Sequence, residues 1–278
     1  MPVRPRETLP TGALQLDAAP LLSQLGGSVL RSAPVDDALM SNAGIRALIE
    51  GGHLHEAEGE LALSMQEGRR GTFVAGRMAL RQAMREGAAA SWTDTLHTTP
   101  FLRTLRGAPH LPDAVTGSVS HKRTLALAAV ASRGLTTPVG LLEHVGVDLE
   151  RRPTATDLSR PSIATRILTP QETDWLRMAA DNPLREREAV LVHFAVKEAI
   201  YKAIDPFVHR YVRFTEVELD RPVDADSGEA TVKLLLPELQ TGEVAVRAQW
   251  HLDGDWIVAT AYSARAGELV GPNGTRLR

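Results

Sequence analysis

The sequence predicts an α+β fold built from two similar halves, residues 1–140 and 141–278, related by pseudo-twofold symmetry. Segments with apolar residues at helical spacing alternate with short runs of strand type, which is typical of a mixed helix and sheet protein. Residues 75–80 can be aligned with residues 195–200 without a gap, and strand-like segments follow each of these helical runs. Such self-similarity indicates an internal repeat, although a chance likeness between two alanine-rich helices explains the same match.

The composition is that of a globular protein. Of the 278 residues, 43% are hydrophobic and 23% are charged, and the formal net charge is −3. No apolar run approaches the roughly 20 residues that a membrane span needs, and the first residues lack the apolar core of a signal peptide. Because cysteine is absent, disulfides and thiolate metal sites are excluded. We therefore expect a cytoplasmic protein with no membrane partner.

The first half is expected to contain two helices, at residues 56–67 and 69–86. Residues 1–55 show weak periodicity and are expected to form only short strands and loops. The second helix carries Arg69 and Arg77 and ends at Gly87, since glycine is typical just after a helix. Between positions 69 and 123, nine basic residues stand against three acidic ones. This balance suits a site for an anion beside a metal, or equally a solvated basic face.

A buried strand at residues 125–131 follows the dipeptide Ser120-His121. The strand is predicted from an unbroken apolar run, and the dipeptide would then lie at one end of the sheet. Ser120 and His121 cannot form a nucleophile and base pair, because adjacent strand residues point to opposite faces. A hydrogen-bonded turn histidine is the plain alternative for His121.

Residues 145–150 form the sharpest strand pattern of the chain. Apolar residues alternate with Gly146, Asp148 and Glu150, which predicts a half-buried strand with both carboxylates on its outer face. Two like charges so close repel each other unless they are solvated or bridged by a cation. Oxygen ligands without cysteine suit Mg²⁺ better than zinc, while an exposed strand end is the alternative.

The second half contains two further helices and a sheet. Thr169, Pro170 and Glu172 form a capping-box sequence that starts one helix, and Asn182-Pro183 breaks it. A second helix is predicted at 184–204, with Asp205-Pro206 as its stop. It carries Glu198 and Lys202 one turn apart, which alone would indicate an exposed ion pair. Strands are expected at 215–219, 230–236, 244–252 and 256–263, the last two joined by a hairpin turn at Asp253-Gly254.

Two of these segments carry a resemblance to a known family. The runs Gly146-Val147-Asp148-Leu149-Glu150 and Phe194-Ala195-Val196-Lys197-Glu198-Ala199-Ile200-Tyr201-Lys202 resemble the paired signature of the 4′-phosphopantetheinyl transferase superfamily. The Gly76-Arg77 helix, the Gly107-Ala108-Pro109 loop with Ser120-His121, and the turn at 169–172 resemble that family's other blocks. The resemblance covers roughly residues 56–262 and points to the long, monomeric type with two halves.

The resemblance implies that the phosphopantetheine arm of coenzyme A is transferred to a serine of an apo acyl or peptidyl carrier protein, with release of 3′,5′-ADP. The active site would lie in the cleft between the halves. By the family pattern, Asp148, Glu150 and Glu198 would hold Mg²⁺, or Mn²⁺ in its place. Glu198 would also be the general base, and Lys202 would stabilise the leaving phosphate. The coenzyme A phosphates would be held by Arg77, Ser120 and His121, with Arg69 as a helper.

Two departures and two alternatives accompany this interpretation. Ala108 stands where some members have a lysine, and Phe194 stands where the family usually has a tryptophan. A magnesium-dependent nuclease or phosphohydrolase would use the same carboxylates, but few aromatic residues are present to stack on bases, so no nucleic-acid partner is expected. A catalytically silent module that binds carrier proteins is the other alternative.

Overall fold

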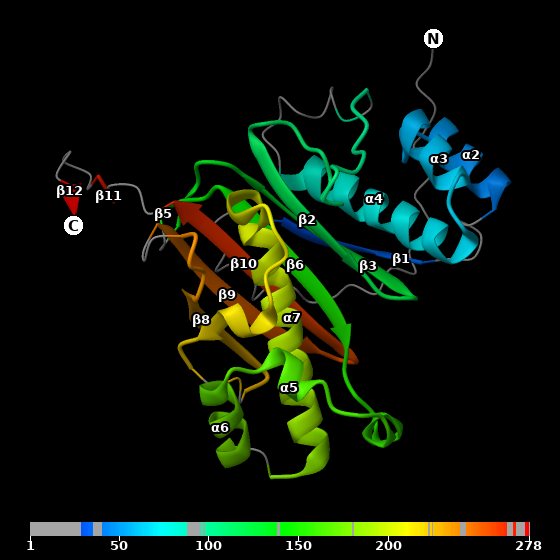
Figure 1. Ribbon diagram of the computed structural model, residues 1–278. Coiled ribbons are helices and arrows are strands. Elements are labelled where there is room, and N and C mark those ends of the chain that lie inside the picture. The colour runs from blue at the N-terminus through cyan, green and yellow to red at the C-terminus, as the bar shows by residue number, and fades with distance from the viewer. Residues whose placement is uncertain are drawn as a thin grey trace.

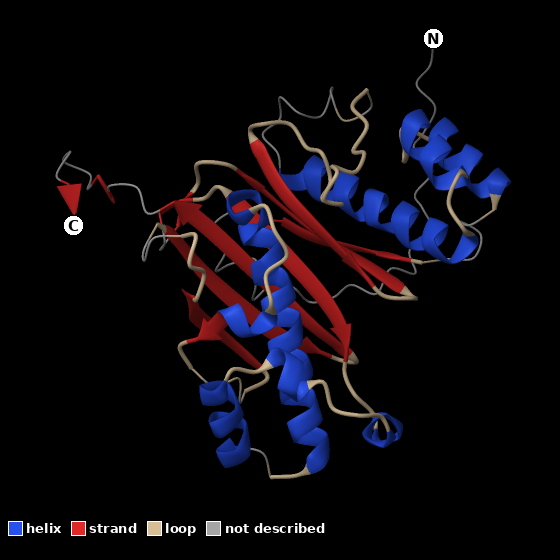
Figure 2. Ribbon diagram, viewed as in Figure 1, coloured by secondary structure: helices blue, strands red, loops and turns tan. Residues whose placement is uncertain are grey.

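Two antiparallel sheets, each crossed by one long helix, form the body of the protein (Figures 1 and 2). The computed structural model describes residues 29–35, 41–87, 96, 98–137, 140–179, 181–221, 223, 225–239, 243–265, 269–270 and 276–277. Among these residues, no helix is both long enough and apolar enough to cross a membrane. The α+β class predicted from the sequence is confirmed.

The first half packs helix α4 (Glu67–Gly87) on a three-stranded sheet. The strands are β1 (Val29–Pro34), β2 (Val115–His121) and β3 (Leu125–Ser132), in the order β1-β3-β2. Helix α4 contributes Ala75, Ala79 and Ala83 to the core beneath it, so small side chains allow the helix to lie close to the sheet. Helices α2 (Asn42–Glu50) and α3 (Glu56–Leu63) pack on the early part of α4.

The second half packs helix α7 (Pro183–Val208) on a five-stranded sheet. The strands are β6 (His144–Arg151), β7 (Val217–Leu219), β8 (Ser227–Leu234), β9 (Val244–Asp253) and β10 (Trp256–Arg265), in the order β6-β10-β9-β8-β7. Helices α5 (Ala164–Ile167) and α6 (Pro170–Ala179) lie beside α7. The shorter elements are two 3₁₀ helices (Ala155–Ser159 and Phe214–Glu216) and the strand pairs β4 (Thr136–Thr137) with β5 (Gly140–Leu141) and β11 (Leu269–Val270) with β12 (Arg276–Leu277).

The two halves share one chain order. In the first half, strand β1 precedes helix α4, the hairpin β2–β3 follows it, and β3 pairs between β1 and β2. In the second half, β6 precedes α7, the hairpin β9–β10 follows it, and β10 pairs between β6 and β9. The likeness of residues 75–80 to 195–200 therefore falls on corresponding helices, as expected of two similar halves.

The halves meet where β2 lies along the outer edge of β6. Alternate residues of β2 offer hydroxyl groups to that edge: Thr116 Oγ1 accepts from the Val145 N–H at 3.0 Å, and Ser118 Oγ accepts from the Val147 N–H at 3.1 Å. These bonds satisfy edge N–H groups that would otherwise be buried without a partner. A shared apolar core, which includes Leu127, Val147 and Trp256, fills the space behind them.

Two local predictions are wrong. Residues 42–50 form a helix instead of loops and short strands, because Ser41 caps it and Ile45 and Leu48 bury one face three residues apart. Helix α7 also continues past Asp205-Pro206 to Val208. Proline in a final turn removes only one hydrogen bond, and the helix then ends at His209, whose left-handed conformation (φ 56°) lets its N–H bond to Asp205 O.

Candidate active site

The carboxylates of β6 face helix α7 and are buried, which corrects the prediction that they lie on an outer face. Asp148 is 5% exposed and Glu150 is 9% exposed. Gly146, two residues earlier on the same face, lies so close to the helix that a Cβ atom there would come within 1.9 Å of Ala199 O. The absence of a side chain at Gly146 thus lets α7 approach Asp148.

Asp148 is the centre of a small polar cluster that joins both halves. Its Oδ1 accepts hydrogen bonds from Ser120 Oγ on β2 and from Lys202 Nζ on α7, both at 2.7 Å. Lys202 Nζ also donates to Val147 O at 2.8 Å. Asp148 Oδ2 is buried and has no hydrogen-bond partner among the described residues. Oδ1 is therefore held in place by two hydrogen bonds, while Oδ2 can still accept a hydrogen bond or coordinate a cation.

Glu198 and Glu150 complete an acidic group around Asp148. Glu198 is half-buried on α7, and burial, opposed by Lys202 and reinforced by Asp148, raises its pKa. Glu150 forms an ion pair with Lys122, and its pKa is raised by burial and by the charges of Asp148 and Glu198 despite that lysine. The three carboxylates thus repel one another in a site where lysines supply the positive charge.

The described residues, these carboxylates included, do not form a preformed metal-binding site. Across the described ranges, no group of three histidine, aspartate or glutamate side chains is placed to hold a metal ion together. Lys122 and Lys202 instead neutralise Glu150 and Asp148. The orphan Asp148 Oδ2 and the mutual repulsion of the three acids nevertheless suit a hard divalent cation, since oxygen donors are the ligands that Mg²⁺ prefers.

A cleft of about 250 Å³ opens beside this cluster, between the two halves. Glu198 and Lys202 lie on its α7 wall, Arg77 and Phe73 on its α4 wall, and His121 at the end of β2. The loop 103–109 forms the remaining wall, and Arg103, Arg106, Gly107, Ala108 and Pro109 line it. A binding space and a group of acid and base residues are therefore adjacent.

Arg77 is the most unusual cation of the cleft. Its side chain is 4% exposed, and its Nε and Nη2 atoms have no hydrogen-bond partner in the described part of the chain. Burial lowers its pKa to about 10, and the nearby charges of Arg103 and Arg81 add to this effect. Arg77 and Arg103 both lie over the Phe73 ring, at 4.6 and 5.2 Å from its centroid. Such buried N–H donors, with no partner, favour a bound anion.

The other predicted phosphate ligands are placed differently. His121 lines the cleft, and burial together with the positive charges of Lys202, Arg103 and Lys122 lowers its pKa. Ser120 points to the opposite side of β2, as adjacent strand residues must, and its hydroxyl binds Asp148. Arg69 lines a neighbouring surface hollow, which shares His121 and Thr72 with the cleft.

Two segments that together span most of the chain match models of one protein family. Residues 57–131 match the model for the 4′-phosphopantetheinyl transferase N-terminal domain, and residues 144–261 match the model for the 4′-phosphopantetheinyl transferase superfamily. The chain belongs to the 4′-phosphopantetheinyl transferase superfamily. The two matched segments contain every predicted site residue, and the resemblance stated from the sequence is confirmed.

Individual relatives in this superfamily agree with that assignment. The chain is 30% identical over 177 residues to the 4′-phosphopantetheinyl transferase Svp of Streptomyces mobaraensis, covering 63% of this chain and 65% of that protein. It is 29% identical over 215 residues to the 4′-phosphopantetheinyl transferase Npt of Nocardia iowensis, covering 75% of this chain and 86% of that protein.

Two solved structures show a partial likeness to this chain. An ACPS–coenzyme A complex, described as from Chronobacterium ammoniagenes, is 26% identical, with a TM-score of 0.33, covering 44% of this chain and 96% of that one. A holo-(acyl-carrier-protein) synthase from Bacillus anthracis, in complex with CoA (3′,5′-ADP), is 22% identical, with a TM-score of 0.27, covering 38% and 93%.

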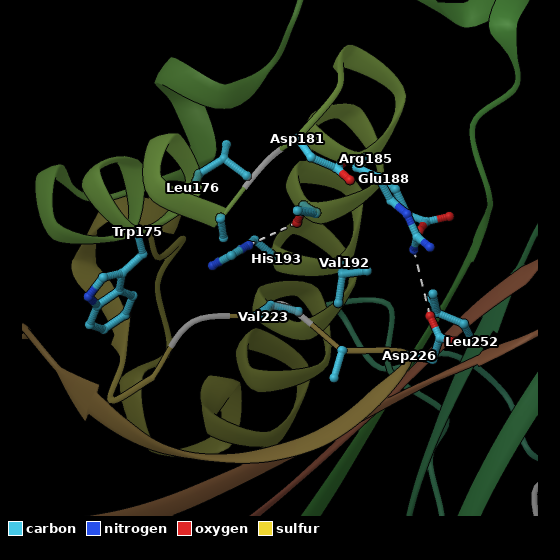
Figure 3. Close-up of a pocket in the computed structure, with 13 residues that line it drawn as sticks. Trp175, Leu176, Asp181, Arg185, Glu188, Val192, His193, Val223, Asp226 and Leu252 are labelled. Carbon is cyan, nitrogen blue, oxygen red and sulfur yellow. Dashed lines mark hydrogen bonds and ion pairs between the residues drawn. The ribbon is translucent and has the colours of Figure 1, made fainter.

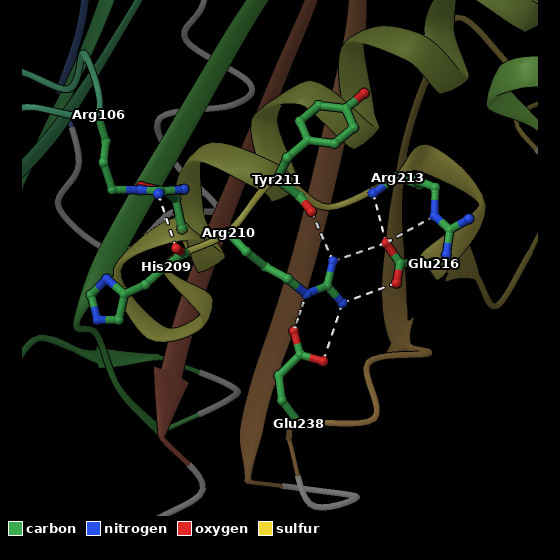
Figure 4. A network of polar contacts seen from close by, with 8 residues as sticks. Arg106, His209, Arg210, Tyr211, Arg213, Glu216 and Glu238 are labelled. Atoms are coloured by element: carbon green, nitrogen blue, oxygen red, sulfur yellow. Dashed lines mark hydrogen bonds and ion pairs between the residues drawn. The ribbon is translucent and has the colours of Figure 1, made fainter.

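The sequence alone did not predict the roles of two arginines on the loop 103–109. Arg103 supplies a second cation beside Arg77, and Arg106 links the halves: its Nε atom donates to both carboxylate oxygens of Asp205, at 2.9 and 2.8 Å. Arg106 Nη1 also donates to His209 O at 3.0 Å (Figure 4). Neither arginine lies in a segment with helix or strand periodicity, so the direction of neither side chain could be predicted from the sequence. Only their positive charge pointed to a role in binding an anion.

The segment after α7 is fixed by its own ion pairs. Arg210 bridges Glu216 and Glu238, with Nη2–Oε1 and Nε–Oε1 distances of 2.9 and 2.6 Å (Figure 4). This bridge and the Arg106 contact hold the same turn at the end of α7. The wall of the cleft that carries Tyr201, Lys202 and Asp205 is thereby anchored at its C-terminal end.

Proposed function

We propose that the protein transfers the 4′-phosphopantetheine arm of coenzyme A to a serine of an apo acyl or peptidyl carrier protein and releases 3′,5′-ADP. The observation that carries this proposal is the cleft between the halves, where Arg77, with two unpartnered buried nitrogen atoms, and Arg103 line the same space as Glu198 and Lys202. An anionic nucleotide and a proton acceptor can be held there side by side.

The coenzyme A phosphates would occupy the basic side of this cleft. Arg77 offers two buried donors, and Arg103 and His121 add further donors around the same space. Arg69 would contact an outer phosphate from the neighbouring hollow, while Ser120 acts indirectly by orienting Asp148. A bound phosphate would compensate the burial of Arg77 and would raise the lowered pKa of His121.

Glu198 is proposed as the general base. Its raised pKa makes it a better proton acceptor than an ordinary surface glutamate, and it faces the cleft where a serine hydroxyl would enter. As Glu198 removes the hydroxyl proton, the serine oxygen forms a bond to the β-phosphorus and the bond from that phosphorus to the 3′,5′-ADP oxygen breaks. Lys202, one turn along α7, would stabilise the charge on the departing oxygen.

Asp148, Glu150 and Glu198 are proposed to hold Mg²⁺, with Mn²⁺ as a substitute. The orphan Asp148 Oδ2 and the mutual repulsion of the three acids support this assignment, although Glu150 would have to exchange Lys122 for the metal. When bound, the cation would neutralise charge on the diphosphate. Coenzyme A, the metal and the carrier are the expected partners, and nucleic acid is not among them.

We propose that the chain is organised as two functional halves. A boundary near residue 140, in the connection between β3 and β6, would separate the phosphate-binding half from the metal-binding half. Because each half contributes residues to one cleft, a monomer would suffice for activity. The absence of cysteine is compatible with a cytoplasmic location.

The experiment that tests the activity is the intact mass of a carrier protein after incubation with the protein, coenzyme A and Mg²⁺. We expect the apo carrier to gain the mass of one phosphopantetheine, with an equal amount of 3′,5′-ADP in solution. A carrier variant with alanine at the acceptor serine should stay unchanged. Hydrolysis of coenzyme A without a gain in carrier mass would indicate a phosphohydrolase, and carrier binding without any reaction would indicate a silent module; either result contradicts transfer.

A further inference from the structure

A second cavity, larger than the catalytic cleft, lies in the second half between α6, the first turns of α7, and Val223, Ala225 and Asp226. Its volume is about 430 Å³. For comparison, a cavity of about 150 Å³ is sufficient to hold a benzene ring. Trp175, Leu176, Val192 and Val223 give it apolar walls (Figure 3). None of its lining residues lines the catalytic cleft, so this is a separate space.

A buried histidine faces this cavity with one free nitrogen. His193 is 2% exposed, and its Nε2 atom has no hydrogen-bond partner among the residues that the structure describes. Its Nδ1 atom lies 2.8 Å from Ala189 O (Figure 3). Because a carbonyl oxygen can only accept, Nδ1 must carry the proton and Nε2 must present a lone pair. Burial lowers the pKa of His193, which keeps the ring in this neutral form.

The charges around the cavity exclude an anionic ligand. Asp181, Glu188 and Asp226 line it, and Arg185 is the one lining cation within the described ranges. Arg185 lies between Glu188 and Asp226, at 3.2 and 3.8 Å, and Arg152 from outside the cavity also pairs with Glu188. The carboxylates therefore remain in excess, and phosphates or acyl carboxylates would be repelled.

We propose that this cavity binds a small aromatic molecule that carries a hydrogen-bond donor and no negative charge. Its ring would pack against Trp175 and the aliphatic walls, and its hydroxyl or N–H group would donate to His193 Nε2. This pairing satisfies a buried acceptor that is otherwise left without a partner, whereas a ring without a donor leaves it unsatisfied. The proposal does not depend on the transferase activity.

The test is a titration of the isotopically labelled full chain with phenol, followed by the NMR signal of the Trp175 indole N–H, which a Trp175→Phe variant assigns. We expect saturable shifts with a dissociation constant on the order of 1 mM, as suits so small a ligand. Anisole has the same ring but cannot donate, and should bind about tenfold more weakly. Benzoate should bind more weakly still, because of its charge.

His193→Leu removes the acceptor and should weaken phenol binding about tenfold, to the level of anisole, while anisole binding stays as it was. His110→Leu, at an exposed position outside the cavity, is the matched control and should bind phenol like the natural protein. Absence of a saturable Trp175 shift, or equal binding of phenol and anisole to the natural protein, would overturn the proposal. The phenol and anisole comparison decides the matter even if His193→Leu folds poorly.

Discussion

Arg77 is buried at a cost to stability that a bound anion would offset. A guanidinium with two unpartnered, buried N–H donors is desolvated without compensation, so its burial opposes folding. Arg81, one turn later on α4, is equally buried but bonds to Glu58 and Thr99 O, at 3.0 and 2.9 Å, and serves the fold. Two arginines of one basic segment thus differ in whether the described part of the chain supplies partners for their N–H groups, a difference that the charge pattern of the sequence could not show.

Glu198→Gln tests the catalytic assignment at the level of one residue. We expect transfer to fall by at least about 10²-fold, because glutamine cannot accept the serine proton. Stability should stay equal or rise slightly, since the raised pKa of Glu198 means that its charge is unfavourable in the folded state.

The rate of carrier modification and a thermal unfolding curve measure both effects of Glu198→Gln. Near-normal turnover would show that Glu198 is not the general base. Loss of the folded state would contradict the expectation that the charge of Glu198 is unfavourable for folding.

Other single residues were only partly predictable. Asp148, Glu198 and Lys202 were singled out by the resemblance of their two segments to a known family. Strand alternation alone placed Asp148 on an outer face, and the helical spacing of the other two alone indicated an exposed ion pair. The partners of the acids could not be inferred: Ser120 on β2 bonds to Asp148, and Lys122, the residue after β2, pairs with Glu150, and both belong to the other half. Sequence spacing holds no information about which strand edge faces which.

At the level of elements, α6 and α7 are joined by a fully buried ion pair. Lys197 Nζ lies 2.6 Å from Glu172 Oε2 and also donates to Ile167 O and Phe214 O, at 2.8 and 3.0 Å. Glu172 in turn accepts from Thr169 N and Leu219 N, at 2.8 and 3.1 Å. Lys197 precedes Glu198, so this network sets the rotation of α7 about its axis and thereby points Glu198 at the cleft.

Breaking this pair should be costly. We expect Lys197→Met to lower the free energy of unfolding by about 3–5 kcal/mol, because Glu172 is left as an uncompensated buried charge. The exposed pair Arg177–Asp174 on α6 is the matched control, and Arg177→Gln should change stability by less than about 0.5 kcal/mol. Urea unfolding monitored by circular dichroism measures both variants; a Lys197→Met protein as stable as the natural one would refute the structural role of the pair.

The contact between β6 and α7 can be tested at Gly146. An alanine there would place Cβ within 1.9 Å of a backbone oxygen that cannot move without displacing the helix. We expect Gly146→Ala to cost at least about 2 kcal/mol of stability and to lower transfer, because Asp148 and Lys202 are pushed apart.

Gly68→Ala in the first turn of α4 is the matched control for Gly146→Ala. A Cβ atom at this position meets nothing within 4 Å, so the variant should be neutral or stabilising by about 0.5–1 kcal/mol. If chemical denaturation gives both alanine variants the same stability, the close approach of α7 to β6 is not a constraint.

The helices and strands that could be predicted best were those whose ends are marked by residues close together in the sequence, such as a helix cap or a hairpin turn. The capping box that starts α6 is present, with Thr169 N donating to Glu172 Oε2 and Glu172 N donating to Thr169 Oγ1. Helix α2 was missed because only one short face of it is apolar. Strand β1 agrees with the short strands expected before residue 55, but its pairing with β3 joins distant residues and could not be predicted. The turn between β9 and β10 falls at Gly254-Asp255, one residue later than expected, with the positive φ at Gly254.

At the scale of the whole molecule, the repeat explains where the cleft lies. Each half forms the same arrangement of a strand, a helix and a hairpin, and the cleft opens where the two arrangements meet. The first half supplies Arg77 and the arginines of the loop 103–109, and the α7 wall supplies Glu198 and Lys202, so both halves are needed to line the cleft. Two similar halves could be predicted from the matching helices, but their contact through the β2 hydroxyls and the Arg106–Asp205 bridge could not.

Coenzyme A is expected to bind in this cleft with its phosphates on Arg77, and calorimetric titration of coenzyme A measures that binding. For Arg77→Gln we predict a dissociation constant about 10- to 100-fold higher than that of the natural protein, with unchanged or greater stability. Arg85→Gln, which removes an arginine of the same helix outside the cleft, should bind as the natural protein does. Equal affinity of the natural protein and Arg77→Gln would contradict the account.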